Sequence, residues 1–263
     1  MKTALVTGPT SGMGLENSRQ LAKMGYDIIV VSNREEQNIS VAASLQTRFG
    51  VKAYPLYADL TQNCAAEHIY SFIHQNSLQI DVLVSNAGIL EFSLMKHSSP
   101  ERLERIVQLH CLQPSKLLYL IGRDMAQRHQ GYILVVSSVS AWMAYPTIAM
   151  YCSTKAFLGN LSQSLWYEYR MDGVGVTALF PGAVDTPLYS LSPSKRKWLR
   201  RAGVMLGPSE VVRKALKGMF KKKRRVVPGV FNSLSLFLVR ITPSWVIRLL
   251  MRIPAIRNIL LRA

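Results

Sequence analysis

The chain has 263 residues, of which 49% are hydrophobic, and a formal net charge of +17. This length can bury one large core, so the composition favours a single compact domain and argues against a disordered protein. The charge is uneven, because residues 1–194 carry 14 basic and 14 acidic side chains, whereas residues 195–263 carry 18 basic side chains and one acid, Glu210. A basic end of this kind fits an anionic membrane, an acidic ligand or nucleic acid, and composition does not choose among them.

Three cysteines, Cys64, Cys111 and Cys152, stand at scattered spacings. An odd number without ligand spacing fits neither a disulfide framework nor a metal site, so we predict no metal and a reducing compartment. The first apolar run begins at Thr3, which leaves no room for a signal or transit peptide. We therefore expect a cytoplasmic protein.

Short apolar segments rich in Val, Ile and Leu alternate with longer helical patterns, which is typical of a parallel sheet built from strand–helix–strand units. Six strands are predicted, at Ala4–Thr7, Asp27–Ser32, Lys52–Ala58, Val82–Ser85, Gly131–Ser137 and Val174–Phe180. Helical patterns cover Gly12–Met24, Asn33–Phe49, Gln62–Gln75, Pro100–Arg128 and Ala149–Met171, and a further helix is expected to start at Pro208 and run into Lys221–Arg225. The sequence predicts an α/β fold with a doubly wound parallel sheet flanked by helices.

A glycine-rich segment, Thr7-Gly8-Pro9-Thr10-Ser11-Gly12-Met13-Gly14, separates the first predicted strand from the first helix. Glycines allow a tight turn and a close approach to a pyrophosphate, and a helix N-terminus offers free N–H groups with a partial positive charge. An ordinary tight turn is the alternative, but the position between strand and helix favours phosphate binding. The expected contacts are Gly8, Thr10, Ser11, Gly12, Met13 and Gly14.

Tyr151 and Lys155 lie four residues apart in a predicted helix, so the phenol and the ammonium share one helix face. A free tyrosine has a pKa near ~10, and an adjacent cation brings its phenolate within reach at neutral pH. This arrangement suits acid–base catalysis. Ser138 stands at the end of the fifth predicted strand, 13 residues before Tyr151, and Ser137 and Ser140 are nearby alternatives.

Further motifs close the third, fourth and sixth predicted strands. They are Asp59, the segment Ser85-Asn86-Ala87-Gly88 and the segment Pro181-Gly182-Ala183-Val184-Asp185-Thr186. Together with the glycine segment and the Ser138, Tyr151 and Lys155 spacing, they resemble the motifs of the short-chain dehydrogenase/reductase family in order and spacing. The resemblance covers roughly residues 2–190 and implies a Rossmann-type fold that binds a nicotinamide dinucleotide.

The resemblance also implies roles for these residues. Ser138 would hydrogen-bond the substrate oxygen, Tyr151 would give it a proton, and Lys155 would hold the nicotinamide ribose, while the cofactor delivers hydride. Beyond the glycine segment, the implied cofactor contacts are Asp59, Leu60, Asn86, Ala87, Gly88, Tyr151, Lys155, Pro181, Gly182, Val184 and Thr186.

Cofactor choice is predicted from the end of the second strand, where the chain reads Val31-Ser32-Asn33-Arg34. An NAD enzyme would normally place an acid here to bind the ribose hydroxyls. Because the acid is missing and Arg34 can pair with a 2′-phosphate, we favour NADP(H), with contacts at Ser32, Asn33 and Arg34. A solvated arginine beside Glu35 and Glu36 is the alternative.

The sequence departs from the family pattern in the helical segment before the fifth strand. Family members carry an Asn there that helps to hold a water connecting the lysine to solvent, and His110 occupies that place here. His110 could hold the same water or relay protons, because histidine titrates near neutrality. A buried histidine without a catalytic part is the alternative, and Gln108 and Gln113 are the next candidates for the position.

The segment between Thr186 and Pro208 is expected to cover the substrate. It contains Leu188, Tyr189 and Leu191, followed by the basic run Lys195–Arg201 with Trp198. An apolar wall with a basic rim would suit a lipid-like carbonyl compound with an acidic group, and a solvated basic loop is the alternative.

The last residues combine apolar and basic side chains. In residues 226–263 arginines together with Pro243 and Pro254 interrupt the apolar runs before they reach the ~18–20 residues of a membrane span, so no transmembrane helix is predicted. The apolar side chains of this segment, with arginines between them, favour peripheral association with an anionic membrane. They are Trp245, Val246, Ile247, Leu249, Leu250, Ile253, Ile256, Ile259, Leu260 and Leu261. A flap over the protein's own cleft or another subunit is the alternative, and nucleic acid is a weaker third.

The sequence thus predicts a Rossmann core in residues 1–190, a substrate loop and basic helix in residues 191–225 and an apolar, basic extension in residues 226–263. The predicted function is an NADP(H)-dependent reductase of a hydrophobic ketone or aldehyde in lipid metabolism, or the reverse oxidation. The alternative is a non-catalytic NADP(H)-binding adaptor that docks through its basic tail. The family resemblance further implies a dimer or tetramer built on the long helices before and after the fifth strand.

Overall fold

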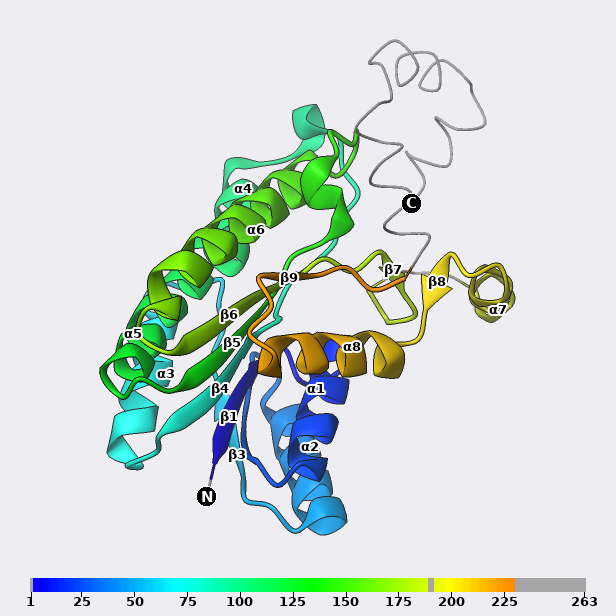
Figure 1. The fold of residues 1–263 in the computed structure, drawn as a ribbon. Coiled ribbons are helices and arrows are strands. Elements are labelled where there is room, and N and C mark those ends of the chain that lie inside the picture. Colours follow the sequence, from blue (N-terminus) through cyan, green and yellow to red (C-terminus); the bar gives the residue numbers. More distant parts are fainter. Residues whose placement is uncertain (1, 189–191, 230–263) are drawn as a thin grey trace.

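A parallel sheet of seven strands forms the centre of the computed structural model, which describes residues 2–188 and 192–229 (Figure 1). The strand order is β3-β2-β1-β4-β5-β6-β9. The strands are β1 (Thr3–Thr7), β2 (Asp27–Ser32), β3 (Ala53–Tyr57), β4 (Ile80–Ser85), β5 (Gly131–Val136), β6 (Val174–Leu179) and β9 (Arg225–Val226). The order reverses between β1 and β4, and ligands of such sheets bind outside the carboxyl ends of the strands at that point.

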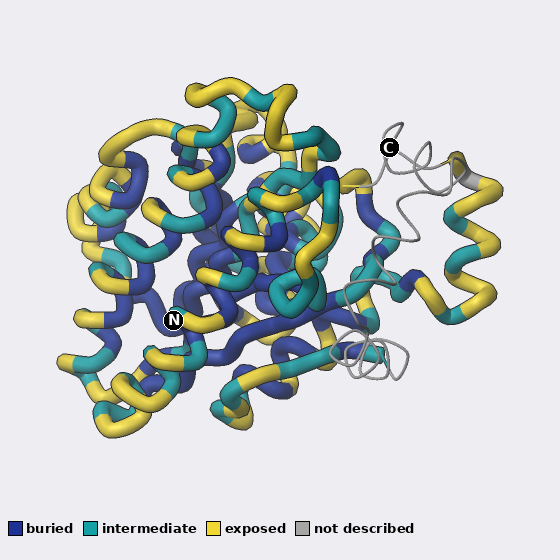
Figure 2. Tube along the Cα trace, turned by 90° about the horizontal axis from the view of Figure 1, so that it is seen from above, coloured by how far each residue is buried: buried dark blue, intermediate teal, exposed yellow. Residues whose placement is uncertain are grey.

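Helices cover both faces of the sheet. Helices α1, α2 and α8 pack on one face, and α3, α5 and α6 pack on the other (Figure 1). The helices are α1 (Gly12–Lys23), α2 (Glu35–Phe49), α3 (Ala65–Gln75), α4 (Pro100–Val107), α5 (Gln113–Gln127), α6 (Ala149–Arg170), α7 (Pro193–Arg201) and α8 (Pro208–Phe220). Figure 2 shows the buried residues concentrated in the middle of the molecule.

This layering explains the strand pattern of the sequence. Every residue of β1, β4 and β6 is buried, because helices exclude water from both faces of the sheet. Such strands appear in a sequence as continuous apolar runs. The predicted α/β fold with a doubly wound parallel sheet is confirmed, and each of the six predicted strands overlaps an observed strand.

The structure contains elements that the sequence did not predict. The two-residue strand β9 pairs with β6, and a small second sheet joins β7 (Ala183–Val184) to β8 (Met205–Leu206). The helix from Pro208 ends at Phe220, and Lys222 adopts a φ of 49° that turns the chain back toward the sheet. The basic run Lys221–Arg225 is therefore divided between a turn and the start of an edge strand.

The predicted helical segment Pro100–Arg128 is interrupted by a π-helical turn, Gln108–Leu112, between α4 and α5. Pro114 lies at the start of α5 and has no N–H to donate, so regular helical bonding does not continue through this region. His110 lies inside the turn and is fully buried. Single π turns occur often at functional sites.

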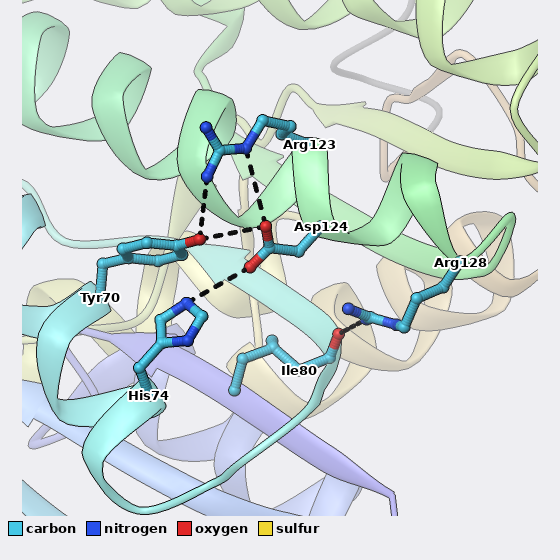
Figure 3. Close-up of polar contacts among 6 residues, drawn as sticks. All are labelled: Tyr70, His74, Ile80, Arg123, Asp124 and Arg128. Atoms are coloured by element: carbon cyan, nitrogen blue, oxygen red, sulfur yellow. Dashed lines mark hydrogen bonds and ion pairs between the residues drawn. The ribbon is translucent and has the colours of Figure 1, made fainter.

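Polar contacts connect α5 with α3, and Arg128 at the end of α5 with the start of β4 (Figure 3). The Tyr70 hydroxyl donates to Oδ1 of Asp124 at 3.1 Å, and Nη2 of Arg123 donates to the same hydroxyl at 3.1 Å. Nη2 of Arg128 donates to the carbonyl oxygen of Ile80 at 2.7 Å. These contacts fix α5 against the strand whose other end carries the Asn86 motif.

The predicted C-terminal extension, residues 226–263, lies outside the described residues from residue 230 onward. In the part of the chain that the structure describes, no helix combines the length and the apolar character needed to cross a bilayer. The division of the chain at residues 190 and 225 stays a prediction.

Candidate active site

A cavity of about 640 Å³ opens at the carboxyl ends of the strands, within the usual range for a small-molecule site. All the residues predicted from sequence to contact a cofactor line this cavity. They are Gly8, Thr10, Ser11, Gly12, Met13, Gly14, Ser32, Asn33, Arg34, Asp59, Leu60, Asn86, Ala87, Gly88, Tyr151, Lys155, Pro181, Gly182, Val184 and Thr186.

The glycine segment forms the turn between β1 and α1. Gly8 and Gly12 adopt φ values of 66° and 53°, which L side chains rarely adopt. A Cβ atom at Gly14 would overlap the carbonyl oxygen of Gly8, so the turn has room only for glycine. Among the described residues, no side chain caps the start of α1, and its first turn contains no acid. The free N–H groups of this turn are suited to an anion.

Thr7 and Asn86 fasten this turn to the end of β4. The Thr7 hydroxyl oxygen accepts hydrogen bonds from the backbone N–H groups of Asn86 and Ala87 at 2.9 and 3.0 Å. In return, Nδ2 of Asn86 donates to the carbonyl oxygen of Thr7 at 3.0 Å. Sequence reasoning missed this role of Thr7, although its position at the start of the glycine motif was a usable signal.

The end of β2 is fixed by a residue that sequence reasoning missed. Asn38 on α2 is buried, and its Nδ2 donates to the carbonyl oxygens of Ser32 and Leu56 at 3.0 and 2.9 Å. The Ser32 hydroxyl donates to Oδ1 of Asn38 and accepts from the backbone N–H of Arg34. The exposed Arg34 side chain is thereby placed at the rim of the cavity, where its Nη1 donates to Oε1 of Gln37 at 3.4 Å.

Ser138, Tyr151 and Lys155 all line the cavity. Lys155 is 3% exposed, its Nζ donates to the carbonyl oxygen of Val136 at 2.9 Å, and it lies 5.7 Å from the centre of the Tyr151 ring. Burial lowers the pKa of the Lys155 ammonium from 10.5 to about 8. At neutral pH the ammonium therefore remains charged and acts on the phenol in a region of low dielectric.

The neighbouring serines have different partners. The Ser137 hydroxyl donates to the carbonyl oxygen of Lys155 at 2.6 Å, so it holds α6 against β5. The Ser138 hydroxyl accepts from the backbone N–H of Ser140 at 3.1 Å and keeps its own proton available for donation. Ser138 therefore lines the cavity with a hydroxyl proton that can be donated to a ligand. Ser137 also lines the cavity, but its hydroxyl proton is used in the hydrogen bond to the backbone of Lys155.

His110 is fully buried, and a Cβ atom at Gly88 would lie 3.0 Å from its Nε2. The backbone N–H of Ile89 donates to Nε2 at 3.0 Å, so the ring proton is on Nδ1 and points to Oγ1 of Thr154 at 2.9 Å. Burial, with a smaller contribution from the Lys155 charge, holds the pKa of His110 well below 6.5. A neutral ring with both nitrogens bonded fits a brace between β4 and α6 better than a proton relay.

Thr154, which lies on α6, connects His110 to the helical turn that carries Tyr151. Its hydroxyl donates to the carbonyl oxygen of Tyr151 at 3.1 Å, and the rings of His110 and Tyr151 lie edge to face with 5.9 Å between their centres. Nothing in the sequence singled out Thr154, because its role depends on contact with a residue 44 positions away.

On the substrate side, Leu188 lines the cavity, whereas Tyr189 and Leu191 lie outside the described residues. The basic helix α7 forms ion pairs with the Pro181–Thr186 loop. Nη1 of Arg196 and Nη1 of Arg200 lie 3.1 and 3.3 Å from the Asp185 carboxylate. Trp198 is 67% exposed. Of the apolar side chains predicted to form a wall of the substrate site, Leu188 lines the cavity. The basic residues of α7, predicted to form its rim, are not among the lining residues.

Within residues 2–188 and 192–229, no group of three His, Cys, Asp or Glu side chains is placed to hold a metal ion. Burial raises the pKa of the Cys111 thiol to about 11, so this cysteine is a poor nucleophile. The predicted absence of a metal stays a prediction.

Comparison with known proteins identifies relatives of the chain. The family model for short chain dehydrogenases matches residues 2–197. Human 17-beta-hydroxysteroid dehydrogenase type 3 is 30% identical over 187 residues, which cover 70% of this chain and 60% of the human protein. Very-long-chain 3-oxoacyl-CoA reductase of Bos taurus is 30% identical over 216 residues, which cover 78% of this chain and 68% of the bovine protein.

The fold also matches solved structures. A short-chain dehydrogenase from Sphingobium yanoikuyae in complex with NADPH superimposes with a TM-score of 0.78 and 24% sequence identity. The match covers 92% of this chain and 97% of that structure. It supports the overall fold.

The state of His110 predicts a pH dependence of stability. Folded His110 stays neutral, whereas a histidine of the unfolded chain takes up a proton below about pH 6.5, so the free energy of unfolding falls as pH decreases through this window. His110→Asn removes this loss, which amounts to at most about 1.4 kcal/mol per pH unit. Denaturant unfolding between about pH 7 and pH 5 measures the two slopes. The exposed His68→Asn should keep the wild-type slope, and equal slopes for His110→Asn and wild type would contradict a neutral buried ring.

Proposed function

The chain belongs to the short-chain dehydrogenase family, and we propose that it is an NADP(H)-dependent oxidoreductase that interconverts a hydrophobic ketone or aldehyde and its alcohol. The observation that carries this proposal is the convergence of Ser138, Tyr151 and Lys155 on the cavity formed by the glycine turn. The names of the human and bovine relatives refer to a hydroxysteroid and to a very-long-chain acyl-CoA, which supports a lipid-like substrate.

The cavity has the properties that a nicotinamide dinucleotide requires. The uncapped first turn of α1 and the glycine turn would hold the pyrophosphate. Arg34 at the rim would pair with a 2′-phosphate, and the Asp59 turn, in which Oδ1 accepts from the N–H of Thr61, would lie near the adenine. Lys155 and the Pro181–Thr186 loop would hold the nicotinamide end. The bound cofactor would supply the hydride.

The side chains of the site then have distinct tasks. Ser138 donates a hydrogen bond to the carbonyl oxygen of the substrate and orients it. Tyr151 donates its phenolic proton to that oxygen, and the buried charge of Lys155 stabilises the phenolate that remains. The carbonyl oxygen of Val136 fixes the position of Lys155, and His110 with Thr154 fixes the helical turn that carries Tyr151. In alcohol oxidation the same groups act in reverse.

We also propose that the protein associates peripherally with an anionic membrane. The exposed basic helix α7 with Trp198 supports this proposal, as does the alternation of arginines and apolar residues in the sequence from residue 226 onward. Such a location would bring a lipid-like substrate to the cavity. The long helices α5 and α6, with the exposed Tyr119 and Phe157, are the surfaces that we propose for a homo-oligomer.

Tyr151→Phe tests the catalytic assignment. We expect the variant to bind cofactor and fold normally but to lose about 10²–10⁴-fold in kcat, because a general acid contributes that much. The assay is NADPH oxidation across long-chain ketones, 3-oxoacyl thioesters and aldehydes. The control is Tyr167→Phe further along α6, whose exposed hydroxyl accepts from Arg224 and which should retain wild-type kcat. Full activity of Tyr151→Phe would rule out its role as the acid.

Arg34→Ala tests the choice of cofactor. Removing a charge-assisted contact with a phosphate should raise the KM for NADPH by about 10- to 100-fold and leave the KM for NADH nearly unchanged. The control is Arg48→Ala at an exposed position in the last turn of α2, the helix that begins directly after Arg34. If both cofactors lose affinity equally, or neither does, Arg34 does not recognise the 2′-phosphate.

Vesicle binding tests the membrane proposal. The full chain should co-sediment with vesicles that contain phosphatidylserine, should not co-sediment with phosphatidylcholine vesicles, and should be released by high salt. Replacing Arg248, Arg252 and Arg257 by Gln should weaken binding by about 3 kcal/mol, at about 1 kcal/mol per basic residue. Replacing Arg19, Arg48 and Arg102 by Gln provides a charge-matched control. Equal binding of both variants, or binding that ignores lipid charge, would contradict the proposal.

A further inference from the structure

A second, smaller cavity adjoins the candidate active site. It has a volume of about 30 Å³ and lies between the loop after β4 and the segment that leads into α6. Its walls share Tyr151 and Glu91 with the large cavity. The two cavities therefore adjoin at these two side chains.

Thr147 forms part of the wall of this small cavity and is held in an unfavourable conformation. It has a φ of 71°, which is a rare conformation for a β-branched residue and costs free energy. The backbone N–H of Ser93 donates to the carbonyl oxygen of Thr147 at 2.7 Å, so the loop after β4 holds the residue in place. Strained residues that the surrounding structure fixes in this way are concentrated at functional sites.

The hydroxyl of Thr147 is also unusual. The residue is 3% exposed, and its Oγ1 has no hydrogen-bond partner among the residues that the structure describes. Buried hydroxyls are nearly always paired, because an unpaired one loses its hydration without compensation. None of the described residues supplies such a partner for Oγ1.

The charges around the cavity indicate what kind of group fits there. Glu91 and Arg102 line it, and Nε of Arg102 lies 2.6 Å from Oε2 of Glu91, so the two charges compensate each other. The other lining residues are mainly apolar, with Leu103, Ile106 and Ile148 among them. This environment fits a neutral oxygen better than a carboxylate.

We propose that this cavity is a substrate subsite, in which Thr147 Oγ1 hydrogen-bonds a second, neutral oxygen of the substrate a few bonds from the reacting carbonyl. The enzyme then prefers ketones that carry such a carbonyl or hydroxyl oxygen over simple ketones. The subsite is too small for an acyl chain, which extends through the large cavity past Leu188. This inference rests on the proposed reductase function and specifies its substrate class.

The test compares two probes that react at the same carbon. One is the N-acetylcysteamine thioester of 3-oxodecanoic acid, and the other is decan-3-one, which lacks the second oxygen. The measured quantity is the ratio of kcat/KM for the thioester to kcat/KM for the ketone, with NADPH. Thr147→Val keeps the shape and the β-branch, so its ratio should fall about three- to tenfold, the size of one neutral hydrogen bond.

Two variants serve as controls. Thr147→Ser keeps the hydroxyl and should keep most of the wild-type ratio. Thr47→Val makes the same substitution on the exposed side of α2, where Oγ1 donates to the carbonyl oxygen of Ala43, and should leave both activities unchanged. Tight NADPH binding by each variant confirms that it has folded.

The outcomes separate the subsite from the function. If Thr147→Val keeps both activities at the wild-type level, the subsite is overturned, because Oγ1 then makes no contact with the substrate. If both activities fall by the same factor, the ratio is again unchanged, and the subsite is overturned in favour of a purely structural role of Thr147. Either result leaves the reductase function intact. If the wild-type enzyme turns over neither probe, the reductase function fails for this substrate class. Whether the subsite exists is then decided by calorimetry, which compares the binding of the two probes to the NADPH complexes of wild type and Thr147→Val. The subsite is supported if the wild-type enzyme prefers the thioester and Thr147→Val loses this preference. It is overturned if the wild-type enzyme shows no preference between the probes.

Discussion

The buried ammonium of Lys155 is the constraint on which the site depends. A cation with 3% exposure loses most of its hydration, and among the described residues the carbonyl oxygen of Val136 at 2.9 Å accepts a hydrogen bond from it. Its pKa falls to about 8 as a result. In the proposed site this charge acts on Tyr151 with little screening by water, and it would act in the same way on a bound cofactor.

The residues around Lys155 are arranged so that they add no further charge. His110 stays neutral, since Ile89 donates to its Nε2 and its Nδ1 proton points to Thr154. Gly88 leaves room for both side chains, because a Cβ there would lie 3.0 Å from Nε2 of His110 and 3.4 Å from Nζ of Lys155. The histidine in place of the usual asparagine is thus accommodated by packing and by hydrogen bonds that a neutral ring can make.

Much of the fold and of the cavity could be predicted from the sequence, because both depend on local signals. Fully buried strands give apolar runs, and the glycine turn and the Tyr151 and Lys155 spacing follow from backbone geometry. Strand β9 has two residues, too few for a pattern. Asn38 and Thr154 matter only through contacts with distant segments, and the conformation of Thr147 has no sequence signature. Their roles could be found only in three dimensions.

The most direct measurement is a crystal structure of the protein with NADPH. The account predicts the pyrophosphate at the first turn of α1, the 2′-phosphate within hydrogen-bond distance of Arg34 and the nicotinamide ribose on Nζ of Lys155, with the ring beside Tyr151. A nicotinamide beyond the reach of Tyr151 and Ser138, or a dinucleotide bound outside the large cavity, would contradict the account.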